Sequence, residues 1–446
     1  MDDTIAAIST ALGVGAISIV RVSGPDSIEI VDRIFDRDLK NAQTHTIHYG
    51  HIMDGKELID EVLVSVMRAP KTFTYEDIVE INTHGGIAAT NKVLELLLLN
   101  GARLAEPGEF TKRAFLNGRI DLVEAEGIMN LIESKSEVSR KLALKQLDGS
   151  VSNNIRALRN KILKLLANIA VNIDYPEYED ILEVTTEDVG KEIVNIEVEL
   201  NKILKQSSET SLVLEGLKTV ILGRPNVGKS SILNMLLNEE KAIVTDVAGT
   251  TRDIVEGSLN LNGVYLKLLD TAGVHSTSDK VEEIGINKSL SLIDEAELIL
   301  LVLDNNSELT NEDQKLLDLT KNKNRIIIVN KIDLDKKLDI NEENIAYLSA
   351  LNKNGLEDLR KKIVEMFNLD SINTDMNSFV NANDIAKIKK CLNLIKKIKE
   401  SIKNSTEIDM IEIDLREINE ILGSIIGESY DEEIIDTIFK NFCLGK

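Results

Sequence analysis

Cysteine is nearly absent from this sequence, which contains only Cys391 and Cys443. Together with the lack of a leader segment, this predicts a protein of the reducing cytoplasm rather than a disulfide-stabilised secreted one. Long apolar runs are also missing, because the stretch Leu298 to Leu303 has only the length of a strand. The chain ends in Gly445 and Lys446, where a prenylation signal needs other residues. We therefore expect a cytoplasmic location and no membrane partner.

Positive charge is scarce in this chain. It has 52 lysines and arginines against 75 aspartates and glutamates, a net charge of −23, which argues against a general nucleic-acid coat protein. One segment departs from this balance, since residues 384–404 contain seven lysines, one aspartate and one glutamate. We favour a solvated helix face opposite an apolar stripe as the explanation, and contact with tRNA is the alternative.

A phosphate-binding motif lies near the middle of the chain. Residues 223–230 have the sequence Gly-Arg-Pro-Asn-Val-Gly-Lys-Ser, the pattern of a P-loop. The apolar run Leu217 to Leu222 precedes it and apolar residues at helical spacing follow it, so we predict a strand, a loop and a helix. Backbone N–H groups of such a loop and the helix dipole bind anionic oxygens. Lys229 is predicted to contact the β- and γ-phosphates, and the Ser230 hydroxyl to bind Mg²⁺.

Further motifs specify which nucleotide is bound. A strand-like run is followed by Asp270-Thr271-Ala272-Gly273. We expect the Asp270 carboxylate to hold Mg²⁺ and the Gly273 N–H to contact the γ-phosphate. Asn330-Lys331-Ile332-Asp333 also follows a strand, and a carboxylate there accepts two hydrogen bonds from guanine that adenine does not donate. Ser349-Ala350 suits a backbone contact to guanine O6. Gly249-Thr250-Thr251-Arg252-Asp253 is a switch loop, with Thr251 as a second Mg²⁺ ligand. These motifs predict a GTPase.

The group that orients the attacking water is not where many GTPases have it. Val274 occupies the position after Gly273, where a glutamine is common, and a valine cannot orient water. Asn226 is either a ligand of a monovalent cation that stabilises charge on the phosphates or a turn residue after a proline. Glu282 either orients the water or is an acid at a helix start. Arg252 is either a catalytic arginine or a surface contact.

The periodicity of apolar residues divides the chain into domains. Up to residue 118, alternating strand-like runs and the helical runs Asp26 to Phe35 and Ile87 to Leu99 indicate an α+β domain. The predicted strands there are Thr4 to Ser9, Ala16 to Val22, Thr44 to Ile52, Glu61 to Met67 and Ile78 to Thr83.

Long helices dominate on either side of the GTPase module. We predict them at Leu122 to Ser134, Glu137 to about Val171, and Thr186 to about Ser208, with more towards the end of the chain. Since an inserted module needs its ends close in space, the helical segments are expected to form one discontinuous domain. The predicted class is thus α/β and α+β multidomain. The predicted domains are residues 1–118 (α+β), 119–212 and 375–446 (helical), and 213–374 (a Ras-like P-loop GTPase domain).

With this layout the whole chain resembles one family. The residues that carry the resemblance are Gly15-Ala16-Ile17, Arg21 to Pro25, Glu76 to Glu80, Glu106 to Gly118 and Phe442 to Lys446. Other P-loop GTPases lack the last two of these segments. On these residues, the chain resembles the MnmE (also called TrmE) family of tRNA-modification GTPases.

The resemblance implies a function and a set of partners. It implies an N-terminal domain that binds a tetrahydrofolate one-carbon donor, such as a 5-formyl- or 5,10-methylene-tetrahydrofolate, and forms a homodimer. It also implies a heterotetramer with the flavoprotein MnmG (GidA), which forms C5-(carboxymethyl)aminomethyl groups on the wobble uridine of tRNA. GTP hydrolysis would depend on Mg²⁺ and K⁺. The alternative is a GTPase switch in ribosome assembly, against which the folate-type N-terminal domain argues.

Residue roles follow from the same resemblance. Asn226, Thr245, Val247 and Thr250 match the family's K⁺ ligands, and Glu282 matches its water-orienting glutamate. Asn226, Lys229 and Glu282 are therefore the predicted catalytic residues. The predicted GTP contacts are Asn226, Val227, Gly228, Lys229, Ser230, Ser231, Thr245, Asp246, Val247, Ala248, Gly249, Thr250, Thr251, Asp270, Thr271, Ala272, Gly273, Asn330, Lys331, Asp333, Ser349 and Ala350.

The folate-contacting positions of the family fall on Arg21, Glu80, Arg119 and Lys446. A carboxylate suits the donors of a pterin, and cations suit the glutamate tail of a folate. Position 119 is an arginine where the family usually has lysine, so a planar guanidinium that can donate two parallel hydrogen bonds replaces a compact ammonium group. Arg21 has an alternative role as an interfacial arginine. Cys443 matches the family's near-terminal cysteine, either as a nucleophile or as a partly buried thiol.

Overall fold

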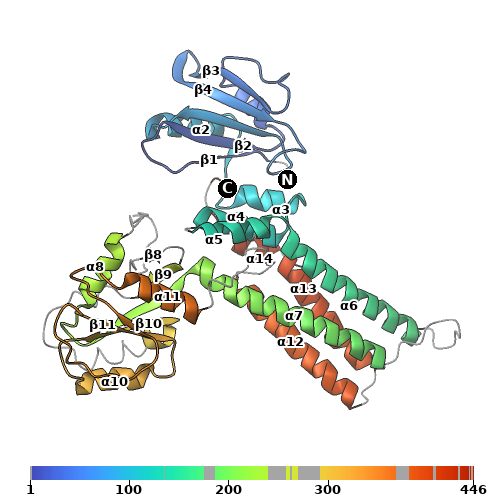
Figure 1. Cartoon of the computed structure of the whole chain (residues 1–446). Coiled ribbons are helices and arrows are strands. Elements are labelled where there is room, and N and C mark those ends of the chain that lie inside the picture. Colours follow the sequence, from blue (N-terminus) through green and yellow to red (C-terminus); the bar gives the residue numbers. More distant parts are fainter. Residues whose placement is uncertain are drawn as a thin grey trace. The chain divides into compact units, whose positions relative to one another are not determined.

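The computed structural model divides into two compact units (Figure 1). Unit 1 contains Met1–Met129, Leu147–Glu177 and Glu412–Lys446, and unit 2 contains Asn130–Gln146 and Tyr178–Ile411. The structure describes residues 3–134, 136–174, 186–239, 258–261, 264–269, 292–367, 381–404, 408–429, 432–440, 442 and 445.

Unit 1 begins with a six-stranded sheet. Its strands are β1 (Ile5–Ile8), β2 (Ile17–Ser23), β3 (Thr46–Asp54), β4 (Glu57–Met67), β5 (Ile78–His84) and β6 (Arg103–Leu104), in the order β3-β4-β5-β2-β1-β6. All neighbours are antiparallel except β1 and β6. The predicted strands are confirmed, whereas the short β6 has no alternating pattern of its own and is not predicted.

One face of this sheet is covered by two helices. Helices α1 (Ser27–Asp32) and α2 (Ile87–Leu99) pack on it through a core that includes Val20, Val64 and Val93. Because side chains alternate along a strand, the other face carries Ile17, Arg21 and the exposed Leu63. Near β1 and β2 this second face is covered by Phe73 and Phe110, whereas Ile17, Ile47 and Leu63 are exposed on it.

The remaining helices of unit 1, together with α5 (Glu137–Leu147), which belongs to unit 2 apart from its last residue, correct one prediction. Helix α6 (Ser150–Asp174) is separate from α5 (Glu137–Leu147), so the single helix predicted from Glu137 to about Val171 is wrong. Gly149 lies between them with a φ of +74°, and a glycine in the left-handed region ends a helix. Apolar spacing continues across this break, which is why periodicity alone misses it. The other helices here are α3 (Glu109–Leu116), which is not predicted, α4 (Leu122–Glu133), α13 (Ile408–Ile426) and α14 (Glu432–Phe439).

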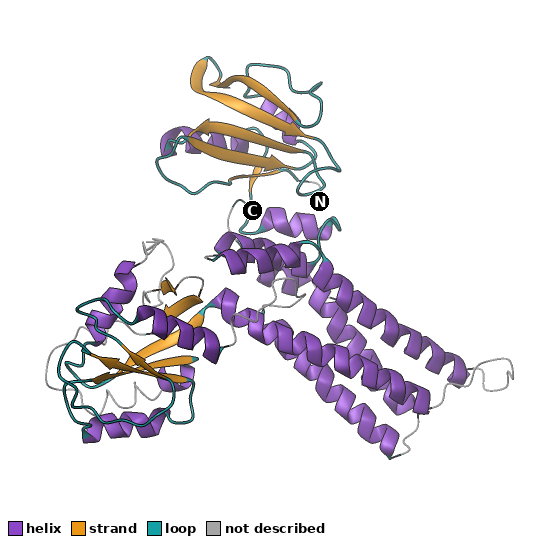
Figure 2. Cartoon of the chain, in the orientation of Figure 1, coloured by secondary structure: helices purple, strands orange, loops and turns teal. Residues whose placement is uncertain are grey.

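Unit 2 contains a second six-stranded sheet, in the order β12-β11-β10-β7-β9-β8. The strands are β7 (Leu217–Leu222), β8 (Ser258–Leu261), β9 (Val264–Leu268), β10 (Leu298–Asp304), β11 (Arg325–Asn330) and β12 (Ile345–Tyr347). Only the β8–β9 pair is antiparallel. Helices α8 (Lys229–Glu239), α10 (Asn311–Thr320) and α11 (Leu356–Met366) surround this sheet (Figure 2). Apolar clusters fill both faces of the sheet. Sheets of this kind bind ligands at the carboxyl ends of their strands.

Two long helices of unit 2 pack side by side. They are α7 (Thr186–Glu215) and α12 (Ala382–Lys403) (Figure 1). Helix α7 extends beyond Ser208, where the prediction ended it, and leads to β7 through Gly216. Among the described helices of either unit, none combines the length and the hydropathy that crossing a bilayer requires.

Candidate functional site

The P-loop follows the central strand β7 of the unit 2 sheet. Strands β9 and β10 lie on either side of β7 and are parallel to it, and β11 and β12 follow in the same direction. Parallel strands end at one edge of a sheet, so the loops that follow them meet there. The structure thereby brings together the P-loop, the segment Asn330 to Asp333 and the pair Ser349-Ala350, as the sequence motifs predict.

Two glycines allow the P-loop to close. Gly223 has a φ of +150° and Gly228 a φ of +99°, values that other residues rarely adopt. A Cβ added to Gly228 would lie 2.3 Å from Nδ2 of Asn330, and one added to Gly223 would lie 2.5 Å from the carbonyl oxygen of Val302. These contacts leave no room for a side chain at either position. The loop is therefore a cradle of backbone groups.

Lys229 begins helix α8 at the base of this cradle. Its Nζ donates hydrogen bonds to the carbonyl oxygens of Gly223 at 2.7 Å and Arg224 at 3.0 Å. Burial lowers the pKa of Lys229, because partial removal from water disfavours the charged form. An anionic ligand would reverse that shift, so the ammonium is placed where negative charge stabilises it. Ser230 follows in the first helical turn, and Asn226 lies at the exposed tip of the loop with a φ of +64°.

Asn330 joins the P-loop to the other two loops. Its buried side chain donates from Nδ2 to the carbonyl oxygen of Val227 at 2.9 Å and accepts at Oδ1 from the N–H of Ala350 at 3.2 Å. One amide therefore fixes the phosphate-binding loop against the loop predicted to contact the base. The role of this asparagine is to position the site.

The two charged residues after Asn330 have different environments. Lys331 Nζ donates to Oδ2 of Asp304 at 2.6 Å and to the carbonyl oxygen of Asn226 at 2.9 Å, so its stem lies across the loop. Asp333 is exposed, and one of its oxygens accepts a hydrogen bond from the Ser349 hydroxyl. A carboxylate held in this way at the open edge is placed to accept hydrogen bonds from a base.

Several predicted site residues lie outside the described residues. These are the predicted contacts between Thr245 and Thr251, the segment Asp270 to Gly273, Glu282, Cys443 and Lys446. The roles assigned to them stay predictions. Of the predicted Mg²⁺ ligands only Ser230 is described, and of the predicted K⁺ ligands only Asn226. Both have the oxygen donors that such ions prefer.

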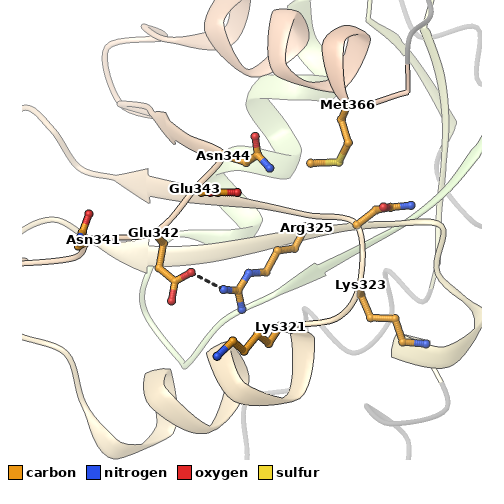
Figure 3. A pocket seen from close by; sticks show the side chains of 9 residues that line it. Lys321, Lys323, Arg325, Asn341, Glu342, Glu343, Asn344 and Met366 are labelled. Atoms are coloured by element: carbon orange, nitrogen blue, oxygen red, sulfur yellow. Dashed lines mark hydrogen bonds and ion pairs between the residues drawn. The ribbon is translucent and has the colours of Figure 1, made fainter.

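A hollow of about 670 Å³ lies at the other end of the same sheet (Figure 3). It opens where β11 and β12 begin, and Arg325 points into it. Arg325 is 2.7 Å from Oε2 of Glu342 and donates to Oγ1 of Thr320. Since its charge is matched by a carboxylate, and the P-loop is at the opposite edge, this hollow is not the nucleotide site.

A second polar cluster lies on the sheet of unit 1. Strands β2 and β5 pair Arg21 directly with Glu80, and Nε and Nη2 of the arginine are each 2.8 Å from Glu80 Oε1. Gly445 comes to the same place, since its carbonyl oxygen accepts from Ser9 Oγ at 2.9 Å and from Arg21 Nη1 at 3.4 Å. A Cβ on Gly445 would lie 2.3 Å from the Ile8 carbonyl oxygen, and its φ is +84°. The end of the chain is therefore held closely against β1 and β2.

Arg119 completes this cluster. Its guanidinium carbon lies 4.9 Å from the ring centroid of Phe73, and that of Arg21 lies 5.8 Å from the same ring. Nη1 of Arg119 is buried and has no hydrogen-bond partner among the described residues. Buried donors are nearly always satisfied, so this one has capacity for a further acceptor.

Two residues of these sites are not predicted from the sequence. Asp304 ends strand β10 and binds Lys331, and its signal is a carboxylate at the end of a buried strand. Phe73 contacts both arginines through its ring, and its signal is only that the chain has few aromatic residues. Neither pattern is specific enough to have identified the residue.

A parallel sheet with a P-loop after its central strand is the fold of P-loop nucleotide hydrolases. Within that class, the Asn-Lys-Ile-Asp segment held beside the loop by Asn330 distinguishes proteins that hydrolyse GTP. The molecule is a GTPase.

Comparison with known proteins specifies the family. The model of the "MnmE helical domain" matches residues 122–443, and that of the "GTP-binding protein TrmE N-terminus" matches residues 4–119. The tRNA modification GTPase MnmE of Lactococcus lactis subsp. cremoris (strain MG1363) is 50% identical over 100% of this chain and 98% of its own length. That of Streptococcus thermophilus (strain CNRZ 1066) is 49% identical with the same coverage. The chain belongs to the MnmE family of tRNA modification GTPases, which confirms the predicted resemblance.

Proposed function

We propose that this GTPase acts in the modification of tRNA. The observation that carries the proposal is the full-length similarity to relatives named tRNA modification GTPase, which includes the N-terminal and helical parts as well as the GTPase part. The product we propose is a C5-(carboxymethyl)aminomethyl group on the wobble uridine. A flavoprotein partner of the MnmG type would supply the redox chemistry, and the location would be the cytoplasm.

The GTP site would work through the described loops and the predicted switch segments. Backbone N–H groups of the P-loop and Lys229 would bind the phosphates, and Asp333 and Ala350 the guanine. Ser230, with Thr251 and Asp270, would hold Mg²⁺, which neutralises charge on the β- and γ-phosphates. The geometry at Asn330 supports this assignment, because it couples the phosphate-binding and base-binding loops.

Hydrolysis would depend on K⁺ and on Glu282. Asn226, with Thr245, Val247 and Thr250, would bind K⁺ against the phosphates, and Glu282 would orient the water. The exposed position of Asn226 at the loop tip supports the first assignment. GTP turnover should then be much faster in K⁺ than in Na⁺, which is too small for this shell, and Asn226→Ala should remove the difference. Equal turnover of the wild-type protein in both salts would refute the K⁺ site.

The N-terminal part would bind a tetrahydrofolate one-carbon donor. Arg21, Glu80 and Arg119 gather around one aromatic ring and the end of the chain, where Lys446 would join them. Glu80 would accept from the pterin, and the arginines would bind the glutamate tail. The donor at Arg119 without a partner in the described residues is the observation that fits this ligand.

We propose that the exposed part of the second face of the unit 1 sheet forms the homodimer. Ile17, Ile47 and Leu63 are exposed there, with exposed fractions of 62%, 68% and 45%. Apolar residues exposed together on a sheet are typical of protein interfaces. Sedimentation at micromolar concentration should give a dimer, and Ile47→Lys with Leu63→Lys should give a monomer.

The modification itself is tested by mass spectrometry of tRNA nucleosides. Cells that lack this chain should lose C5-aminomethyl-type wobble uridines, and the intact gene should restore them. A gene carrying Lys229→Ala serves as the matched control, since it should not restore the nucleosides that the deletion removes. An unchanged profile in the deletion would refute the proposed function and favour a role in ribosome assembly.

A further inference from the structure

The lysines of helix α12 divide into two groups. Lys387 lies 3.1 Å from the buried Asp384, and Lys399 lies 2.8 Å from Glu197 of the neighbouring helix α7. These two lysines are explained by pairing within the protein. For Lys389, Lys396 and Lys403, which are exposed, no acidic partner is found in the part of the chain that the structure describes.

The second group forms a row. Lys389, Lys396 and Lys403 are spaced by seven residues, so they lie on one face of the helix with about 10 Å between successive positions. We call these three residues the α12 lysine face. The opposite side of the helix is buried, through residues such as Ile388, Cys391, Ile395 and Ile398.

The sign of this face is unusual for this protein. The chain has more acidic than basic residues, and the adjacent α7 is itself acidic, with Glu187, Asp188, Glu192, Glu197 and Glu199 in its first half. A face that only needed to be soluble would carry charges of both signs. Within the arc of the lysine face only Glu400 is acidic. Three exposed lysines without an acidic partner in the described part of the chain therefore lie on one face of a helix in an otherwise negative molecule.

We propose that the α12 lysine face binds the phosphate backbone of tRNA. The inference rests on the proposed function, because it names the surface through which this GTPase contacts the tRNA that it helps to modify. A regular row of ammonium groups matches a chain of phosphates and reads no base sequence. The face orients the tRNA, and counterions released from its phosphates contribute to the binding free energy. The two lysines already paired with Asp384 and Glu197 are not part of the surface.

The test is tRNA binding by the full-length protein at several salt concentrations. The triple variant Lys389→Gln, Lys396→Gln, Lys403→Gln should bind the purified tRNA pool about tenfold more weakly at 0.1 M KCl. The slope of log affinity against log salt should fall by about 2 to 3, because each lost phosphate contact removes about 0.7 to 0.9. GTP turnover should stay at the wild-type value, which shows that the variant is folded.

A matched triple variant controls for net charge. Lys56→Gln, Lys315→Gln, Lys361→Gln removes the same charge from exposed positions on other elements, and it should bind tRNA as the wild type does. Equal weakening in both variants, or none in the α12 variant, would overturn the inference.

Two further outcomes separate this inference from its alternatives. If the α12 variant lost binding to vesicles containing anionic phospholipid but kept its tRNA affinity, the face would serve a membrane and the inference would be wrong. If the α12 variant bound tRNA normally while the deletion strain lacked the modified nucleosides, the inference would fail and the proposed function would stand. If the wild-type protein neither bound tRNA nor affected the nucleosides, both would fail.

Discussion

The P-loop site of unit 2 and the arginine cluster of unit 1 are built in opposite ways. The P-loop is one continuous segment whose backbone forms the cradle, and Lys229 bonds only to carbonyls five and six residues away. The arginine cluster is assembled from residues 59 and 424 positions apart, namely Arg21 with Glu80 and Arg21 with Gly445. Backbone conformation therefore determines the first site, and long-range pairing of side chains determines the second.

We expect substitutions to affect the two sites differently. A site made of backbone is sensitive to any added atom, because peptide groups cannot move aside cheaply. A site made of charged side chains on a sheet tolerates added atoms but depends on each partner being present. The predictions below separate these two behaviours.

The largest effect is expected from one methyl group in the P-loop. Gly228→Ala places a Cβ at 2.3 Å from Asn330 Nδ2 and forces alanine to a φ of +99°. Strain of this kind costs about 1 to 3 kcal/mol, and displacement of Asn330 separates the two loops that it joins. We expect GTP affinity to fall roughly a hundredfold or more, measured by titration with a fluorescent GTP analogue.

Gly86→Ala is the control for this change. Nothing lies within 4 Å of a Cβ added there, and its φ is −96°, so GTP affinity should not change. Normal GTP binding by Gly228→Ala would show that the loop is not a backbone cradle.

The next effect concerns a buried arginine that supports the cluster of unit 1. The fully buried Arg113 lies 2.7 Å from Asp3, 3.1 Å from Glu109 and 3.2 Å from Glu76. Arg113→Met would leave Glu76 without its cation and Asp3 and Glu109 with Arg103 alone. Loss of one member of a buried pair costs about 3 to 5 kcal/mol. Amide hydrogen exchange should accelerate about a hundredfold or more in β1 and β5, and stay unchanged in the sheet of unit 2.

Arg140→Met tests whether burial causes this cost. Arg140 forms an exposed ion pair with Glu137, in which the two side chains are 45% and 63% exposed. Such pairs contribute little to the free energy of unfolding. Exchange in β1 and β5 should stay as in the wild type. Equal exchange in the Arg113→Met variant and in the wild-type protein would contradict the prediction.

Acid should weaken the same part of the molecule without any mutation. Burial raises the pKa of Glu109, but hydrogen bonds from Arg103, from the N–H of Glu106 and from Arg113 outweigh it, so the pKa is lowered. A carboxyl whose folded-state pKa is lowered stabilises fully above its unfolded pKa of about 4.3, and the stabilisation is lost as the pH falls through the folded-state value. Exchange in β1 and β5, corrected for its intrinsic pH dependence, should therefore accelerate below pH ~4. A pH-independent corrected rate would count against this network.

The smallest effect is expected at the edge of the arginine cluster. Glu80→Gln removes the charge that pairs with Arg21 at 2.8 Å, in a site where both side chains are partly exposed. We expect about a tenfold loss of affinity for 5-formyltetrahydrofolate, since a charged hydrogen bond is replaced by a neutral one, measured by calorimetry. The exposed Glu57→Gln on β4 should have no effect, and neither variant should change GTP affinity. Unchanged folate affinity in Glu80→Gln would remove Glu80 from the proposed site.

The nucleotide site was largely predictable because its signals are local. Each motif needs only a strand end, a glycine where φ is positive or a carboxylate at a fixed place, and these are properties of a few consecutive residues. The break between α5 and α6 shows the limit of this reasoning. Apolar spacing on both sides of Gly149 is helical, and only the conformation of that glycine separates the helices.

The sequence by itself determined the class of the protein, most of its strands and helices, and the order of its GTP motifs. Only the tertiary structure decided which side chains complete the sites. Asn330 bridges two loops, Asp304 binds Lys331, and the ring of Phe73 contacts two arginines. It also decided which lysines of α12 form the row that has no acidic partner among the described residues. The physical reason is that backbone conformation depends on neighbours in sequence, whereas the pairing of charges depends on neighbours in space, which are set only when strands and helices pack.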